Sequence, residues 1–159
     1  MGPQIPANLI ANKTLGKGKA TIKIPSRSDS THSGAFNVSI NVHFDPVVDP
    51  YPAGTVKITI DLSDSFCGVL TSTMLFHLSS TGKHTPTMYL SGRCTLTSTT
   101  PRPLTHKCQF WLSVANNKRT RDLINSYIVS FLVVDKSGTR VAYGTGPIIQ
   151  GTVHVQAFC

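Results

Sequence analysis

The sequence predicts an all-β protein, a single antiparallel jelly-roll or Greek-key β-sandwich of about eight strands. Several segments alternate apolar and polar residues with a period of two, as half-buried strands do. The chain has seven acidic residues, all aspartate, and so lacks glutamate, which favours helices; threonine, valine and isoleucine, which favour strands, recur throughout. A length of 159 residues fits one domain that can bury a core.

The first predicted strands are the most regular. Residues 35–44 alternate without interruption, and their apolar face holds Phe36, Val38, Ile40, Val42 and Phe44. Prolines then break the chain before residues 55–62, whose inward set is Val56, Ile58, Ile60 and Leu62. Residues 69–78 form a third strand with Met74, Phe76 and Leu78 in phase.

The middle of the chain repeats this pattern. In residues 87–96 the inward positions are Met88, Leu90, Cys94 and Leu96, and Gly92 between them suggests a bulge. In residues 107–115 one face holds Cys108, Phe110, Leu112 and Val114. Trp111 lies on the opposite face, and a ring of this size indicates that the outer side of the strand is also covered.

The last third predicts three more strands. Residues 127–134 are apolar on both faces, which is typical of a central strand or one at an interface. A turn at residues 135–138 leads to a hairpin strand at 139–143, and residues 151–158 form the last strand. Residues 116–126 read as a loop or a short helix. Uneven, proline-broken connections favour jelly-roll or Greek-key topology over a simple meander, with an immunoglobulin-type sandwich as the competing architecture.

Charge gives the strongest functional indication. The net charge is +8, and residues 65–121 contain basic side chains but no acidic one. A protein with this balance is attracted to polyanions before any specific contact forms.

Two basic clusters are the candidate nucleic-acid-binding residues. Residues 1–30 are expected to form a short basic arm in front of a sandwich domain at 31–159, with Gly16 and Gly18 keeping the arm flexible. The cationic side chains of the arm are Lys13, Lys17, Lys19, Lys23 and Arg27. A second cluster in a later loop consists of Lys118, Arg119 and Arg121. Such clusters suit contact with phosphates without base reading, and the alternative is a merely solvated basic surface.

No motif indicates catalysis, a metal or a cofactor, so none is expected. The six histidines are scattered, and no G-x-S-x-G motif accompanies them. Asp61 and Asp64 could bind a cation between subunits, but a solvated turn is the favoured interpretation. No apolar run approaches the roughly 18–20 residues that cross a bilayer, so no membrane partner is expected, and neither is a small-molecule substrate.

The four cysteines form no C-x-x-C pair. They are interpreted as thiols in a reducing compartment, mostly buried. A disulfide between Cys94 and Cys108 on neighbouring strands stays open as an alternative, and Cys159 at the end of the chain could be exposed.

In layout the whole chain, a basic arm before an eight-strand sandwich of near 17 kDa, resembles the jelly-roll coat proteins of small, satellite-type positive-strand RNA viruses. The resemblance implies a non-enzymatic structural protein that is assembled in the host cytoplasm. Many copies would form a small icosahedral virion around RNA held by sequence-independent contacts. Outward apolar residues such as Trp111 and Tyr127 would then form subunit contacts.

A local resemblance supports a different role. Residues 54–64, a glycine-led strand that ends in aspartates, are similar to a strand of the plant-virus cell-to-cell movement proteins, in which the aspartate would fall at Asp61. That family would imply cooperative coating of single-stranded RNA without a closed shell. A third alternative is a β-sandwich module that binds protein or glycan.

Overall fold

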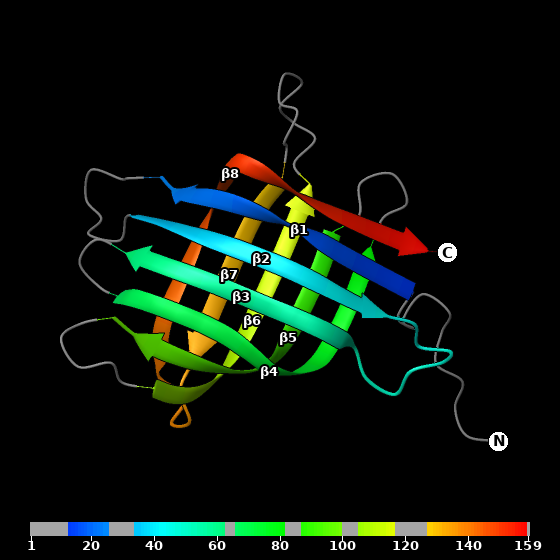
Figure 1. Cartoon of the computed structure of the whole chain (residues 1–159), viewed down its shortest axis with the longest axis horizontal. Coiled ribbons are helices and arrows are strands. Elements are labelled where there is room, and N and C mark those ends of the chain that lie inside the picture. The colour runs from blue at the N-terminus through cyan, green and yellow to red at the C-terminus, as the bar shows by residue number, and fades with distance from the viewer. Residues whose placement is uncertain are drawn as a thin grey trace.

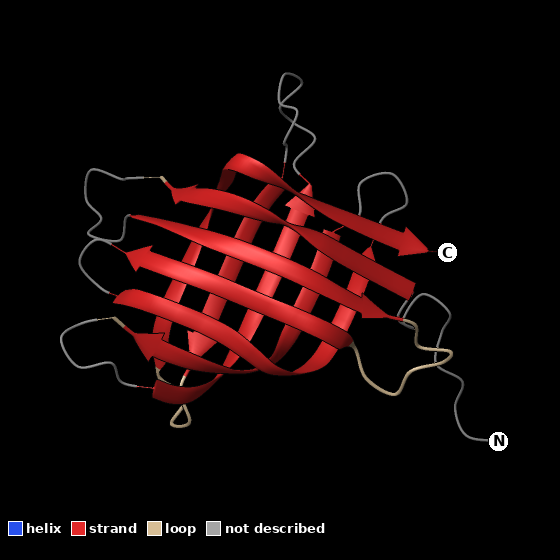
Figure 2. Cartoon of the chain, in the orientation of Figure 1, coloured by secondary structure: helices blue, strands red, loops and turns tan. Residues whose placement is uncertain are grey.

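The computed structural model describes residues 13–25, 34–62, 66–81, 87–99, 105–116 and 127–158. Within these ranges every regular element is a strand (Figure 2), which confirms the all-β class. The strands are β1 (Lys13–Ile24), β2 (Gly34–Phe44), β3 (Ala53–Leu62), β4 (Phe66–Thr81), β5 (Thr87–Ser98), β6 (Thr105–Asn116), β7 (Tyr127–Val134) and β8 (Arg140–Phe158). No membrane-spanning helix is found in the described part of the chain.

The eight strands form a closed antiparallel barrel in which each strand pairs with the next, and β8 pairs with β1. The predicted jelly-roll or Greek-key topology is therefore wrong: the connections are those of the simple meander. Uneven loops misled the prediction because the entropy of closing a loop grows slowly with its length. Doubling a loop costs only about 0.6 kcal/mol, so a long loop can still join two paired strands.

The barrel is flattened, and its two longest strands turn the corners. In Figure 1, β1 to β4 cross in front of β5 to β7, and β8 bends from the rear layer to the front. The first part of β8 pairs with β7 and its last part pairs with β1. A register shift and Gly151, whose φ is 83°, lie near the bend. Bulges of this kind increase the local bend and twist of a strand.

Register shifts in β4 correct part of the predicted burial. The ladder between β4 and β5 shifts between Ser72 and Met74 and again between Leu75 and His77. As a result Leu75 and Leu78 are buried, whereas Met74 and Phe76, predicted to be in phase with Leu78, are exposed. The irregularity suggested by Gly92 thus lies on the facing strand β4.

Residues 13–24, expected to belong to a mobile arm, form β1 instead. This strand is paired with β2 along one edge and with β8 along the other, so it is part of the barrel wall. The predicted boundary at residue 30 therefore does not separate an arm from the fold. Residues 1–12 and 26–33 lie outside the described ranges. The predicted strands at 139–143 and 151–158 are two parts of one strand, β8.

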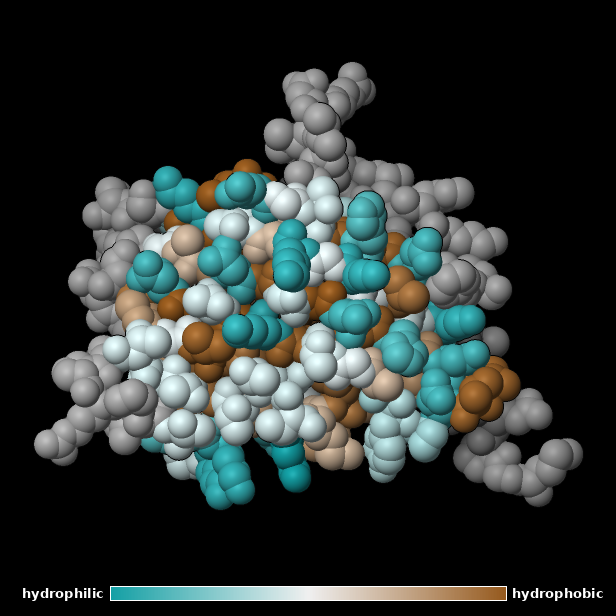
Figure 3. All heavy atoms as spheres, viewed as in Figure 1, coloured by the Kyte–Doolittle hydropathy of each residue, from teal (hydrophilic) through white to brown (hydrophobic). Residues whose placement is uncertain are grey.

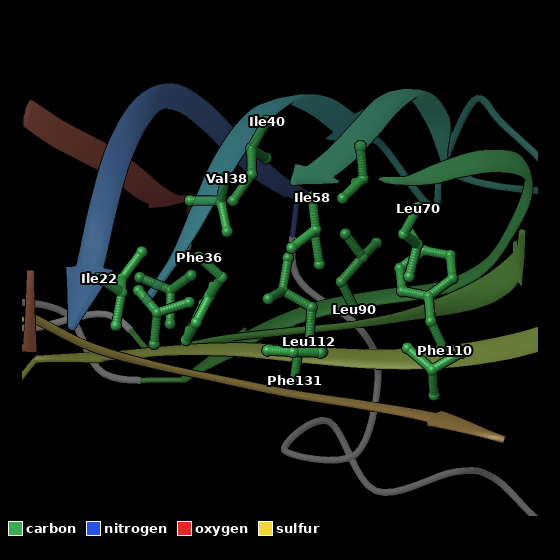
Figure 4. Close-up of a cluster of buried hydrophobic side chains, with 14 of the residues drawn as sticks. Ile22, Phe36, Val38, Ile40, Ile58, Leu70, Leu90, Phe110, Leu112 and Phe131 are labelled. Atoms are coloured by element: carbon green, nitrogen blue, oxygen red, sulfur yellow. The ribbon is translucent and has the colours of Figure 1, made fainter. Parts of the chain in front are cut away.

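The barrel interior is filled by apolar side chains from all eight strands (Figure 4). The inward faces predicted for residues 35–44, 55–62, 87–96 and 107–115 are confirmed, with Phe44 only partly buried. Phe36 and Phe131 meet edge to face, with ring centroids 4.7 Å apart. A Cβ atom at Gly144 would lie 3.0 Å from the Phe131 ring, so this glycine makes room for the ring pair.

Two cysteines face each other inside the barrel. Cys94 of β5 and Cys108 of β6 are register partners, and both are buried free thiols, as predicted. Burial, reinforced by the nearby Cys108, raises the pKa of the Cys94 thiol to about 12. Burial also raises the pKa of Cys108. Both groups are therefore protonated at neutral pH.

Candidate nucleic-acid interface

Strand β1 presents its lysines to solvent. Lys13, Lys17, Lys19 and Lys23 occupy alternate, exposed positions, while Ala20 and Ile22 point into the barrel. This arrangement follows from the period of two, which sends successive side chains to opposite faces of a sheet. The predicted arm lysines are thus held by the barrel wall.

The neighbouring strands extend this basic surface. Lys57 of β3 is also exposed. It lies two strands from Lys19, because Lys19 pairs with Ser39 and Ser39 pairs with Lys57. His154 of β8 pairs with Lys17 on the other side of β1. We call the outer surface of β1, β2, β3 and the part of β8 that pairs with β1 the basic face; Figure 3 shows hydrophilic side chains across the side of the barrel that these strands occupy. Its cationic and imidazole residues are Lys13, Lys17, Lys19, Lys23, Lys57, His43 and His154.

A shallow hollow of about 510 Å³ lies in the basic face between Lys19 and Lys57. Its remaining lining is polar side chains and backbone: Thr21, Asn37, Ser39, Thr59, Gln150, Gly151, Ala20 and Val38. The Thr21 hydroxyl donates a hydrogen bond to the Asn37 carboxamide oxygen, which ties β1 to β2 across the floor. Ammonium and hydroxyl groups at this spacing are suitable donors to phosphate oxygens.

Acidic groups are scarce around the basic face. Asp61 is the only acidic residue within the eight described strands. Its Oδ1 accepts a hydrogen bond from the Cys67 thiol at 3.3 Å, and this contact raises the pKa of Cys67. The described residues contain no cluster of three potential metal ligands, and Asp64, the expected partner of Asp61, lies outside them. The positive potential of the face is therefore little opposed.

A second basic hollow lies beside the turn between β7 and β8. It measures about 560 Å³, and its lining includes Arg93, Lys107 and Lys136 together with Asp135. Asp135 Oδ1 accepts hydrogen bonds from Ser137 N at 2.9 Å, Ser137 Oγ at 2.6 Å and Thr139 N at 3.0 Å. The Ser137 hydroxyl contributes most to lowering the pKa of Asp135. The Asp135 carboxylate thus stabilises the turn, and Arg93, Lys107 and Lys136 line the same hollow.

Part of the outer surface of β5, β6 and β7 is apolar by contrast. A groove of about 320 Å³ there is lined by Tyr89, Trp111 and Leu132, among others. Tyr89 is 47% exposed and Trp111 is 44% exposed. We call this surface, formed by Tyr89, Trp111 and Leu132, the aromatic face. Tyr127 was predicted together with Trp111 as a subunit-contact residue. It is partly buried and packs against the core at the start of β7.

The structure therefore places some of the predicted site residues on one surface, whereas others lie outside the described residues. Lys13, Lys17, Lys19 and Lys23 share one strand face, whereas Arg27, Lys118, Arg119 and Arg121 lie outside the described residues. Sequence reasoning missed Lys57 and Lys107 as site residues, because each is an isolated lysine in a neutral strand. Alternation alone places both on an outer face, but only the order of the strands shows which other cations are near them.

Comparison of the chain with protein-family models, with curated proteins and with solved structures found no match.

Proposed function

We propose that this protein is a non-enzymatic RNA-binding protein that holds phosphates on its basic face without reading the base sequence. The observation that carries the proposal is the ladder of exposed β1 lysines beside Lys57, on strands whose only acidic residue is Asp61. Contacts from lysine to phosphate position a nucleic acid but carry no sequence information.

The shape of the site supports this mode of binding. An eight-stranded barrel is just wide enough for side chains to fill its interior, and apolar side chains fill this one. A ligand therefore meets the outer wall. Base stacking is not expected at the lysines, because β1 carries no aromatic side chain; the exposed rings of Tyr89 and Trp111 belong to the aromatic face, and that of Tyr51 lies on the turn between β2 and β3. Affinity should come from charge and should fall steeply with salt.

We expect the protein to bind single-stranded RNA oligomers of unrelated sequence with similar affinity, and the affinity to fall linearly in a plot of log K against log salt concentration. Lys19→Ala should lower the slope of that plot by about 0.7, because one phosphate contact with a single strand contributes about that much. Fluorescence anisotropy at several salt concentrations measures the slope.

Arg140→Gln is the matched control, because it removes an equally exposed positive charge that lies on the other layer of β8 and packs over Tyr143. It should leave the slope unchanged. Absence of binding by the wild-type protein at low salt, or equal effects of both variants, would refute specific use of the basic face.

The aromatic face favours a second, more specific role, that of a coat protein. A shell subunit needs apolar contacts between copies in addition to phosphate contacts with RNA. Trp111 and Tyr89 provide exposed aromatic area of the kind enriched at such interfaces. We propose that copies of the protein associate through this face around RNA in a virion. A movement-type protein would use the same basic face without forming a closed shell.

Light scattering after size exclusion, with absorbance at 260 and 280 nm, tests assembly. A coat protein should give uniform large particles that contain RNA, and Trp111→Lys should reduce them to small species. Val47→Lys, on a turn where Val47 is 91% exposed, is the control for added charge and should leave the particles intact. Heterogeneous RNA complexes would favour the movement-type protein, and a monomer or dimer that ignores RNA would favour a binding module.

A further inference from the structure

One continuous row of residues on the outside of the barrel connects the two basic hollows. The register of the strands places seven positions side by side across β8, β1, β2, β3, β4, β5 and β6. In that order they are Thr152, Lys19, Ser39, Lys57, Thr71, Thr95 and Lys107. We call this set the lysine–hydroxyl row.

Every member of the row is a lysine or carries a hydroxyl, and every member is at least partly exposed. Neighbouring strands lie about 4.8 Å apart, so Lys19 and Lys57 are separated by about 10 Å and Lys57 and Lys107 by about 14 Å along the wall. Hydroxyl groups fill the intervals between the lysines. A phosphate chain laid along the row would therefore meet a hydrogen-bond donor on each strand.

The row passes through both hollows. Lys19, Ser39 and Lys57 line the hollow in the basic face. Lys107 lines the second hollow, which adds the cations Arg93 and Lys136. Thr71 and Thr95 are the only positions of the row between them.

A path along β1 is the alternative, and it is less favourable at both ends. In one direction it passes Leu15, an apolar side chain at an outward position. In the other it ends at Lys23, whose register partner Ala35 pairs with Asp61, the acidic residue of the strands. Along β1 a phosphate chain would leave the second hollow uncontacted.

The curvature of the row selects the kind of polyanion. The row spans seven of the eight strands and so wraps around much of the barrel. Duplex nucleic acid is stiff, with a persistence length of about 50 nm for DNA, and cannot follow a turn of this size at low cost. A flat anionic membrane would touch only a few adjacent strands at a time. A flexible single strand can follow the whole row.

We propose that the lysine–hydroxyl row is the path of single-stranded RNA, which crosses the strands and wraps around the barrel from the basic face to the hollow at Lys107. This inference rests on the proposed RNA-binding function and adds to it the direction of the RNA, together with Lys107, Thr71 and Thr95 as contact residues.

Two double variants distinguish an RNA path across the strands, along the lysine–hydroxyl row, from an RNA path along β1. Lys57→Ala with Lys107→Ala removes two charges from the row, and Lys17→Ala with Lys23→Ala removes two charges from β1 outside it. All four lysines are exposed, so both variants should fold, which thermal unfolding verifies. Loss of two phosphate contacts from a single strand should lower the salt slope by about 1.4 and the affinity at 0.1 M salt by about 25-fold.

We expect this loss for the row variant with single-stranded RNA, and a clearly smaller one for the β1 variant. The reverse order, or equal losses, would overturn the path while leaving RNA binding by the basic face intact. Wild-type binding that is absent at low salt would instead overturn the proposed function itself.

A duplex RNA of the same length and vesicles rich in phosphatidylserine test the selection by curvature. The wild-type protein should bind both more weakly than the single strand at equal salt, and the row variant should lose less affinity for them. Tighter binding of the duplex or the vesicles would refute the wrapped path.

Discussion

Replacing Phe36 with alanine is expected to lower the free energy of unfolding by about 3–5 kcal/mol, the range for removal of a buried aromatic ring. Phe36 is 1% exposed, and its ring meets Phe131 edge to face inside the barrel (Figure 4). The space left behind cannot collapse easily, because the surrounding side chains are attached to a closed wall of paired strands. Urea unfolding followed by tryptophan fluorescence measures the change.

Phe76→Ala is the matched control for this prediction. It removes the same side chain from the outer surface of β4, where Phe76 is 37% exposed and packs against the Arg93 guanidinium. Its cost should be well below that of Phe36→Ala, since much of the ring already contacts water. Similar costs for the two variants would contradict the packed interior. A double-mutant cycle between Phe36 and Phe131 should show a coupling of about 0.5–1.5 kcal/mol.

Alkaline pH is expected to destabilise the protein through Cys94. The pKa of this thiol is raised from 9.0 to about 12 by burial and by Cys108. Between pH 9 and about pH 12 the unfolded chain releases the thiol proton while the folded chain keeps it, so the folded state binds more protons than the unfolded state. The stabilisation is therefore complete below pH 9 and is lost as pH rises toward 12, at a rate of up to about 1.4 kcal/mol per pH unit.

Urea unfolding at a series of pH values from 7 to 11 measures this loss. Cys94→Ala should be less stable than the wild-type protein at pH 7, because it leaves a small void, but its stability should fall less steeply above pH 9. Cys67→Ala is the comparison for a thiol outside the core, because Cys67 is only half-buried on the outside of β4 and its pKa is raised chiefly by the hydrogen bond to Asp61. If the wild-type protein and Cys94→Ala lose stability in parallel, the buried Cys94 thiol does not cause the alkaline loss.

The closed wall also explains why binding is proposed for the outside of the molecule. Because the interior is occupied by the core, chemical variety lies on the outer positions of the strands. Those positions differ along the wall: lysines and hydroxyls predominate on β1 to β3 and continue as Thr95 and Lys107 on β5 and β6, whereas the exposed rings of Tyr89 and Trp111 lie farther along those two strands. The proposed RNA path and the proposed contact between copies therefore use different outer positions of the same barrel.

The local sequence was sufficient to predict the buried side chains of a strand wherever apolar and polar residues alternate regularly. Residues 35–44 show this well, because Phe36, Val38, Ile40 and Val42 are all buried as predicted. It failed for β1, whose inward positions include Gly16, Gly18 and the small Ala20, so the hydrophobic period was absent. Gly16 is matched from the far side of the interior by Met88, whose sulfur would lie 2.5 Å from a Cβ atom there. The side chain that fills the space at Gly16 thus comes from β5, across the interior, and β1 itself has no hydrophobic period.

The glycines of β8 and the bulges of β4 show the same limit. Gly144 and Pro147 read as loop residues, yet a neighbour supplies the volume that Gly144 lacks, and β8 continues through both residues. In β4 the register shifts change which side chains face inward, and no pattern in the surrounding sequence predicts these shifts. Such features depend on the shape of the closed barrel and are invisible to a period counted along one strand.

The sequence by itself determined the all-β class, the inward faces of most strands and the scarcity of acids, because these properties follow from composition and from the period of two. Only the tertiary structure decided that the sheet closes as a meander, and that Lys19, Lys57 and Lys107 lie in one row. Pairing joins residues far apart in the chain, and one residue of register shift would turn every side chain to the opposite face, so the row exists only in the folded barrel.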